Sequence, residues 1–182
     1  MSTLKVNTIT NISGGTDISG VGIIKSYAII ADGKSGNTDG GSFSAGDWRT
    51  RDLNHEISDT DSIVSISNNQ FTLGAGKYLI KASSPACQVG GHQIRLYSVT
   101  DDAAIKNGTP EFSGQIASGA QTRSFLEMVY TISVDTTFAI QHRCSTTQSQ
   151  TFGAGAASSG SVAWNSGSNT VFYTIVELYK GS

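Results

Sequence analysis

Val171-Phe172-Tyr173-Thr174-Ile175-Val176-Glu177-Leu178-Tyr179-Lys180 is the stretch of sequence that decides the fold. Nearly every residue in it is β-branched, aromatic or aliphatic, and this composition predicts a β-strand. A strand with one face in water should alternate apolar and polar residues, whereas this stretch is largely apolar on both faces. We therefore predict that it lies inside a sheet and is covered on both sides.

The two faces of this predicted strand differ in character. The even-numbered face is mostly aliphatic, with Val176 and Leu178, as expected for the core of a β-sandwich. The odd-numbered face combines Tyr173, Ile175 and Tyr179 with one glutamate, a mixture common at protein–protein interfaces. We therefore expect the odd-numbered residues to contact another copy of the chain. A strand within a larger monomeric barrel is the alternative.

The composition of the 182-residue chain argues against several classes of function. Charged residues make up only 14% of it and the net charge is −2, with no basic run, so nucleic-acid binding through charge is not expected. No apolar run approaches the ~20 residues of a membrane helix, so no membrane insertion is expected. The first residues do not open a signal peptide, and synthesis in a cytoplasm is expected. Cys87 and Cys144 have no metal-ligand spacing and are expected to be buried free thiols.

Short strand-like segments separated by turns run along the rest of the chain, and no helical pattern interrupts them. The predicted strands cover residues 22–32, 48–54, 62–66, 71–73, 77–83, 92–99, 122–133, 138–144, 161–164 and 171–180, with loops at 33–46, 101–120 and 146–160. This number of strands at this spacing predicts an all-β, two-sheet antiparallel sandwich formed by residues 23–182.

Residues 1–22 differ from the rest, because single aliphatic residues are widely spaced among Asn, Thr, Ser and Gly. Such a segment is too thin to build a core alone. It would be ordered as a short extended stem if three copies wrapped around one another and buried Val6, Ile9, Ile12 and Ile18 on a shared axis. The alternative is a flexible tail.

No constellation of residues in the sequence predicts catalysis. A Gly-x-Ser-x-Gly elbow, a His-Glu-x-x-His motif and a phosphate-binding loop do not occur. His142 and Cys144 would point the same way on a strand, but no Asn or Asp is placed to orient them, so a Cys–His nucleophile is disfavoured. Asp59-Thr60-Asp61 and Asp101-Asp102 offer oxygen ligands for Ca²⁺, yet a role in turns is favoured. We predict that the protein is not an enzyme and holds no cofactor or metal.

The order of the segments resembles a known family. Phe71-Thr72-Leu73-Gly74-Ala75-Gly76-Lys77-Tyr78-Leu79-Ile80 is similar to the stretch before the third major strand in the jelly-roll domain of complement globular heads and tumour necrosis factors. A Tyr-bearing first strand, a long loop with a Trp and the closing strand complete the resemblance, which covers residues 22–180. It implies a homotrimer whose final strand lies in the sheet that faces the threefold axis. The sequence has no Gly-x-y stem repeat, so the immune roles of that family are not implied.

The opening Met1-Ser2-Thr3-Leu4-Lys5-Val6-Asn7-Thr8-Ile9 resembles the start of tail-fibre and appendage proteins of marine, cyanobacteria-infecting bacteriophages. Such proteins join an N-terminus that attaches to the virion to a trimeric C-terminal head. The resemblance implies that Val6, Ile9 and Ile12 belong to a virion-attachment segment that contacts other virion proteins. It also implies that the protein is part of a virion assembled in the host cytoplasm.

Loops at the end of the head opposite the stem are the predicted recognition site. If successive strands alternate in direction, the loops at that end are residues 33–47, 85–92, 133–136 and 165–170. Trp48 and His92, beside two of these loops, would stack on sugars or donate hydrogen bonds, although core filling is the alternative for Trp48. The small polar side chains that suit carbohydrate hydroxyls are Ser35, Asn37, Asp39 and Asn165.

These inferences predict a trimeric phage fibre head that attaches non-covalently to a host-surface glycan or lipopolysaccharide. The alternative is a purely structural virion trimer, either a capsid decoration or a tail adaptor, without a receptor. A polysaccharide-cleaving enzyme is disfavoured, because the sequence does not show two carboxylates placed on one groove.

Overall fold

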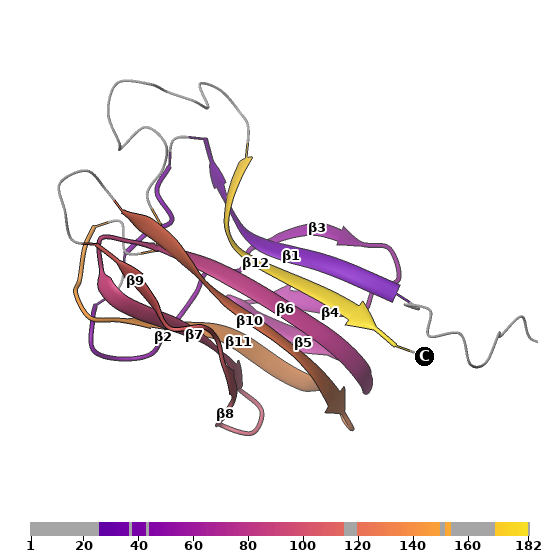
Figure 1. Cartoon of the computed structure of the whole chain (residues 1–182). Coiled ribbons are helices and arrows are strands. Elements are labelled where there is room, and N and C mark those ends of the chain that lie inside the picture. Colours follow the sequence, from indigo (N-terminus) through magenta and orange to yellow (C-terminus); the bar gives the residue numbers. More distant parts are fainter. Residues whose placement is uncertain are drawn as a thin grey trace, which may run out of the picture.

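The computed structural model describes residues 26–36, 38–42, 44–114, 120–149, 152–153 and 170–181, and every regular element in those ranges is a β-strand. In chain order the strands are β1 (Ser26–Ser35), β2 (Arg49–Thr50), β3 (His55–Asp59), β4 (Val64–Ser67), β5 (Gln70–Leu73), β6 (Gly76–Cys87), β7 (Gly90–Ser98), β8 (Ala103–Asn107), β9 (Glu111–Ser113), β10 (Gln121–Ile132), β11 (Thr136–Cys144) and β12 (Thr170–Lys180). They form two antiparallel sheets that face each other (Figure 1). This arrangement confirms the predicted all-β, two-sheet jelly-roll sandwich.

The first sheet has the final strand at its centre. Its strand order is β10-β6-β12-β1-β3, so β12 is hydrogen-bonded to β6 on one side and to β1 on the other. In the register of these pairs, Tyr179 lies between Leu79 of β6 and Tyr27 of β1. The central position that its composition predicted is therefore confirmed.

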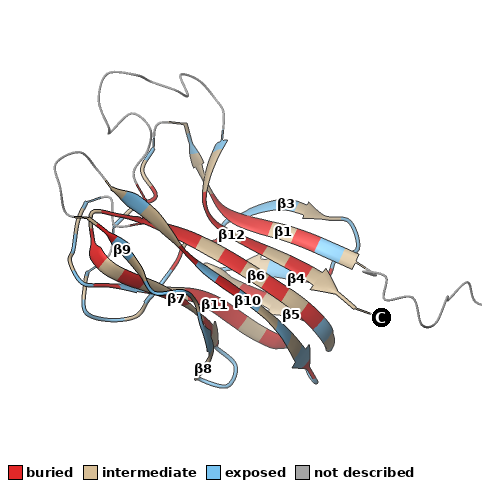
Figure 2. Ribbon diagram, in the orientation of Figure 1, coloured by how far each residue is buried: buried red, intermediate tan, exposed pale blue. Residues whose placement is uncertain are grey.

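The second sheet faces the first across the hydrophobic core. Its strand order is β4-β5-β11-β7-β8, and in addition β2 pairs with β11 and β9 pairs with β7. Figure 2 shows buried residues alternating with less buried ones along the strands, as expected when one face of each sheet is covered. Fully buried side chains from both sheets meet there: Ile30, Phe71, Leu73, Tyr78, Ile80, Ile94, Leu96, Phe138, Ile140, Val176 and Leu178.

Three strands were missed by the sequence prediction, and all three lie at sheet edges. β3 borders β1 in the first sheet, while β8 and β9 lie along β7 in the second. Edge strands carry polar side chains and few buried ones, so their sequences lack the alternation that identifies a strand. Of the predicted strand 48–54, only Arg49–Thr50 pairs with a neighbour. The predicted strand 161–164 lies outside the described residues.

The strand pairing shows which strand ends and turns lie at each end of the sandwich. Ser26 pairs with Lys180 at one end, here called the basal end, and Ser35 pairs with Thr170 at the opposite, apical end. The turn between β6 and β7 and the end of β11 are apical, because β6 runs from its basal start to the apical end. Residues 133–136 were predicted to be apical, and this was wrong. They follow Ile132, which pairs with the basal start of β6.

A buried arginine ties the apical end together. Arg51 is fully buried, and its Nε donates a hydrogen bond to Thr174 Oγ1 at 2.7 Å. Its two terminal nitrogens donate to the carbonyl oxygens of Pro85 at 3.3 Å and Phe152 at 2.9 Å, and its guanidinium carbon lies 3.8 Å from the centre of the Phe152 ring. Burial lowers the pKa of Arg51 to about 9. This one side chain connects the segment after β2 with β6, β12 and residues 152–153.

Candidate functional site

The outer surface of the first sheet, here called the β12 face, carries large apolar side chains contributed by four strands. In register across β10, β6, β12 and β1, three rows make up this face: Phe125, Ser83 and Ile175; Glu127, Lys81, Glu177 and Ile29; and Val129, Leu79, Tyr179 and Tyr27. Phe125, Val129 and Tyr27 are 53%, 58% and 45% exposed in the single chain. Large apolar side chains left exposed on the face of a sheet are typical of a site that another protein covers.

Two of the three residues predicted at a subunit interface lie on the β12 face. Ile175 and Tyr179 are half-buried by their neighbours within the chain, and the Tyr179 hydroxyl donates to Glu177 Oε2 at 2.8 Å. Lys81 forms an ion pair with Glu127 at 3.4 Å in the same row as Glu177. The face therefore has an apolar surround and a charged middle row.

The prediction was wrong for Tyr173, which is buried within its own chain. Its ring is only 5% exposed and its hydroxyl donates to the carbonyl oxygen of Thr38. Residues 38–42 and 152–153 are hydrogen-bonded to each other through their backbones and cover this part of β12. A Cβ atom added at Gly153 would lie 2.7 Å from the Tyr173 ring, which is too close, so the glycine is what lets the backbone approach.

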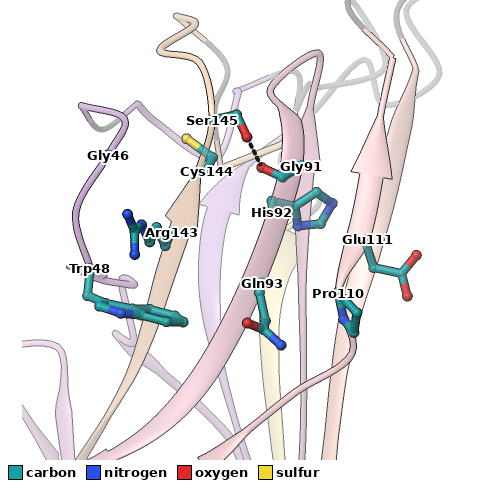
Figure 3. Close-up of a pocket in the computed structure, with 10 residues that line it drawn as sticks. All are labelled: Gly46, Trp48, Gly91, His92, Gln93, Pro110, Glu111, Arg143, Cys144 and Ser145. Atoms are coloured by element: carbon teal, nitrogen blue, oxygen red, sulfur yellow. Dashed lines mark hydrogen bonds between the residues drawn. The ribbon is translucent and has the colours of Figure 1, made fainter.

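A cavity of about 430 Å³ opens on the second sheet at its apical end, and we call it the Trp48 cavity (Figure 3). It is formed by the loop before β2, the start of β7, the start of β9 and the end of β11. The lining residues are Gly46, Trp48, Gly91, His92, Gln93, Pro110, Glu111, Arg143, Cys144 and Ser145. Two residues that the sequence singled out for ligand binding, Trp48 and His92, thus lie at the same cavity, and a ligand role for Trp48 stays a prediction.

Trp48 is held in place on the sheet by an arginine. The guanidinium carbon of Arg95 lies 4.3 Å from the centre of a Trp48 ring, and Arg95 Nε donates to Gln141 Oε1 at 2.8 Å. The indole is only partly buried, so it does not fill the core, which was the alternative role considered for it. A partly exposed indole with a fixed orientation is suited to stacking on a flat apolar ligand surface.

His92 takes a structural position at the inner wall of the cavity. It is 4% exposed, with Nδ1 2.9 Å from His142 Nε2 and Nε2 2.8 Å from Thr122 Oγ1. The pKa of His92 is lowered to about 4, mainly by burial; Glu111 opposes the shift and Arg51 adds to it. Both ring nitrogens are engaged within the chain, so the predicted donation of a hydrogen bond from His92 to a ligand conflicts with its position.

Arg143 is the lining residue that the sequence prediction missed. It is exposed, and its guanidinium makes no hydrogen bond or ion pair with any residue that the structure describes. It follows the inward-facing His142 on β11 and points outward in register with Gln93 of β7. Figure 3 shows Arg143 on the same side of the cavity as Trp48, with Glu111 on the far side. The pattern of alternation on β11 was the only signal that could have identified it.

The remaining predicted ligand residues are not gathered at this cavity. Ser35 is exposed at the apical end of β1, and Asp39 is partly buried near the Tyr173 side chain. Neither lines the Trp48 cavity. Asn37 and Asn165 lie outside the described residues, as do Val6, Ile9 and Ile12 of the predicted stem.

The geometry offers little for nucleophilic chemistry at His142 and Cys144. The Cys144 thiol is buried and lies 3.4 Å from the carbonyl oxygen of Thr146, and burial raises its pKa. A reactive cysteine needs the opposite, a lowered pKa that favours the thiolate. The imidazole of His142 faces His92 instead of the thiol.

The aspartates considered as calcium ligands instead accept hydrogen bonds within local turns. Asp59 accepts hydrogen bonds from the backbone amides of Ile63 and Val64 at 2.9 and 3.0 Å, and Asp101 and Asp102 accept from side-chain hydroxyls of β7. Within the described residues, no group of three or more His, Cys, Asp or Glu side chains is placed to hold a metal ion. The same part of the chain contains no helix that is long and apolar enough to cross a membrane.

The strand order and the facing sheets place the chain in the class of jelly-roll domains. The globular domain of zebrafish complement 1qA protein is similar over 86% of this chain and 96% of its own, at 14% sequence identity and a TM-score of 0.50. Murine APRIL, in a crystal structure at pH 5.0, is similar over 85% of this chain and 98% of its own, at 7% identity and a TM-score of 0.50. No family model matches the sequence, and no curated protein matches it. At these identities the likeness shows the fold, and it agrees with the fold that the sequence resemblance implied.

Proposed function

We propose that the protein is a homotrimeric, non-enzymatic binding protein whose subunits associate through the β12 face. The observation that carries this proposal is the set of apolar side chains that the single chain leaves exposed on this face, above all Phe125 in one row and Val129 in the row of Leu79 and Tyr179. Closed rotational symmetry would cover this face on every subunit at once. A homotrimer is also what the sequence resemblance to complement globular heads and tumour necrosis factors implies.

Ligand binding belongs to the opposite side of each subunit. The Trp48 cavity lies on the second sheet, so assembly through the first sheet leaves it open. Three cavities on one rigid head bind a repetitive surface with an avidity that exceeds the affinity of each single site. This division of the sandwich into an assembly face and a ligand face supports a role in attachment.

Within this proposal, the trimer is the head of a bacteriophage fibre or related virion appendage and attaches to a host-surface glycan or lipopolysaccharide. The resemblance of the first nine residues to phage appendage proteins supports this assignment. Val6, Ile9 and Ile12 would then dock the protein to other virion proteins. The basal start of β1 at Ser26, opposite the cavity, is compatible with a stem on that side.

Two measurements test this function. Light scattering of the purified full-length protein should give about 57 kDa, three times the 19.0 kDa of one chain. Phage particles that lack the protein should adsorb poorly to host cells, and the purified trimer should compete with intact particles for adsorption. A stable 19 kDa species would refute the trimer, and normal adsorption of depleted particles would favour the purely structural virion role.

A further inference from the structure

We propose that the Trp48 cavity binds a saccharide that carries a carboxylate, such as a uronic acid or another sugar acid. This inference rests on the proposed attachment function and names the chemical class of its ligand. Three features of the cavity carry it: an arginine without a hydrogen-bond or ion-pair partner among the described residues, an aromatic ring held by Arg95, and the side-chain oxygens of Gln93 and Glu111. At about 430 Å³ the cavity falls in the ~300–1,000 Å³ range of small-molecule sites.

Arg143 supplies the group that recognises the carboxylate. Its guanidinium is exposed at the cavity and has no ion-pair partner among the described residues. A guanidinium presents parallel N–H donors that match the two oxygens of a carboxylate. By contrast, Arg95 is already committed to Trp48 and Gln141, and it does not line the cavity.

Trp48 supplies the surface on which a sugar ring stacks. The apolar C–H face of a pyranose packs on an aromatic ring, and an indole offers a large and rigid surface at low entropic cost. Arg95 fixes the ring before any ligand arrives, which reduces the ordering cost of binding. Arg143 and Trp48 line the same cavity, and Figure 3 shows both on the side opposite Glu111, so they are placed to contact one bound saccharide.

Gln93 and Glu111 supply oxygens that are suited to hydroxyl groups. The Gln93 side-chain amide donates to the carbonyl oxygen of Gly108 at 2.8 Å, which leaves its own oxygen to accept a hydrogen bond. In Figure 3 this oxygen is turned toward the side where Trp48 and Arg143 lie, and Glu111 lies beyond it. The Glu111 carboxylate repels a ligand carboxylate but accepts hydrogen bonds from hydroxyl groups. It therefore favours the orientation in which the carboxylate of the sugar lies at Arg143.

The experiment titrates the full-length trimer with four probes: oligosaccharides that end in galacturonate, glucuronate, N-acetylneuraminate or a 3-deoxy-octulosonate. Each probe is paired with its carboxyl-reduced counterpart, and binding is followed by NMR shifts of the Trp48 indole N–H. We expect at least one acidic probe to bind and its reduced form to bind about ten- to a hundredfold more weakly, as for loss of a charged hydrogen bond.

Variants separate the role of Arg143 from a general effect of charge. We expect Arg143→Gln to weaken the acidic probe about ten- to a hundredfold, while Arg143→Lys retains part of the affinity because it keeps the charge without the paired donors. Arg49→Gln removes another exposed arginine, one that does not line the cavity, and it should leave the affinity unchanged. Unchanged thermal melting of all three variants would show that each folds.

Two outcomes would overturn the proposal. In the first, no acidic probe binds at millimolar concentration. In the second, the reduced probes bind as tightly as the acidic ones and Arg143→Gln binds the acidic probe as tightly as the wild type does. These outcomes are distinguishable from failure of the proposed function. A trimer that adsorbs equally well to host cells before and after carboxyl reduction of their surface polysaccharide refutes the acidic ligand and leaves attachment intact. If the protein binds the acidic probe but proves to be a monomer or does not adsorb to host cells, the attachment function alone is refuted.

Discussion

Acid should weaken the fold through His92, and the structure gives the sign and size of the effect. Burial between the sheets lowers the pKa of His92 to about 4 from an ordinary value of 6.5, and the pKa of His142 is lowered as well. The unfolded chain therefore takes up a proton near pH 6.5, while the folded protein does so only near pH 4. Stability is fully present above pH 6.5 and is lost as the pH falls from there through about 4. At ~1.4 kcal/mol per unit of pKa difference, His92 alone accounts for a loss of about 3 kcal/mol.

The assay is urea unfolding at one fixed protomer concentration, because a trimer's stability depends on concentration. The free energy of unfolding is compared at neutral pH and near pH 4 for the wild type, His92→Gln and His142→Gln. Glutamine retains a donor and an acceptor but does not titrate, so each variant should lose less stability on acidification than the wild type. Carboxylates such as Asp32 titrate in all three proteins and cancel in the difference. If the wild type and both variants lose the same free energy, the assignment of acid sensitivity to this histidine pair is refuted.

Three further predictions concern assembly, packing and the buried arginine. Val129→Lys on the β12 face should convert the trimer into monomers in light scattering, whereas Val134→Lys, an equally exposed valine off that face, should leave the mass unchanged. Gly153→Ala should lower the free energy of unfolding by about 2–4 kcal/mol, because the new methyl meets the Tyr173 ring at a positive φ, and an unshifted melting curve would contradict this. Arg51→Met should cost about 2–4 kcal/mol in urea unfolding, since three buried hydrogen bonds from the guanidinium to Thr174, Pro85 and Phe152 are lost; a change below ~0.5 kcal/mol would show that these hydrogen bonds contribute little.

The parts of the fold that were predictable from sequence are those whose own residues demand burial. β12 is apolar on both faces and proved to be central, and the Phe71–Ile80 stretch placed Phe71, Leu73, Tyr78 and Ile80 in the core. The edge strands β3, β8 and β9 were missed because their pairing partners, not their side chains, make them strands. Local pattern identifies a buried strand, while an edge strand is defined by long-range pairing.

The candidate site was predictable only in part, for a related reason. Trp48 and His92 were noticed because their residue types are rare and suited to recognition, and the fold brings both to one cavity. The sequence did not show that His92 is bonded to His142 and Thr122, or that Tyr173 is covered by residues 38–42. Each of these contacts joins segments that are far apart in the chain. Which residues contact each other across such distances follows from the topology and register of the strands, and the sequence pattern does not determine these.

The pairing of Ser26 with Lys180 at the basal end makes this protein convenient to handle. A biotin acceptor peptide or fluorescent reporter fused beyond Gly181 would emerge on the side away from Trp48. Captured on a sensor chip by such a tag, the molecules would all present their cavities toward the flowing solution.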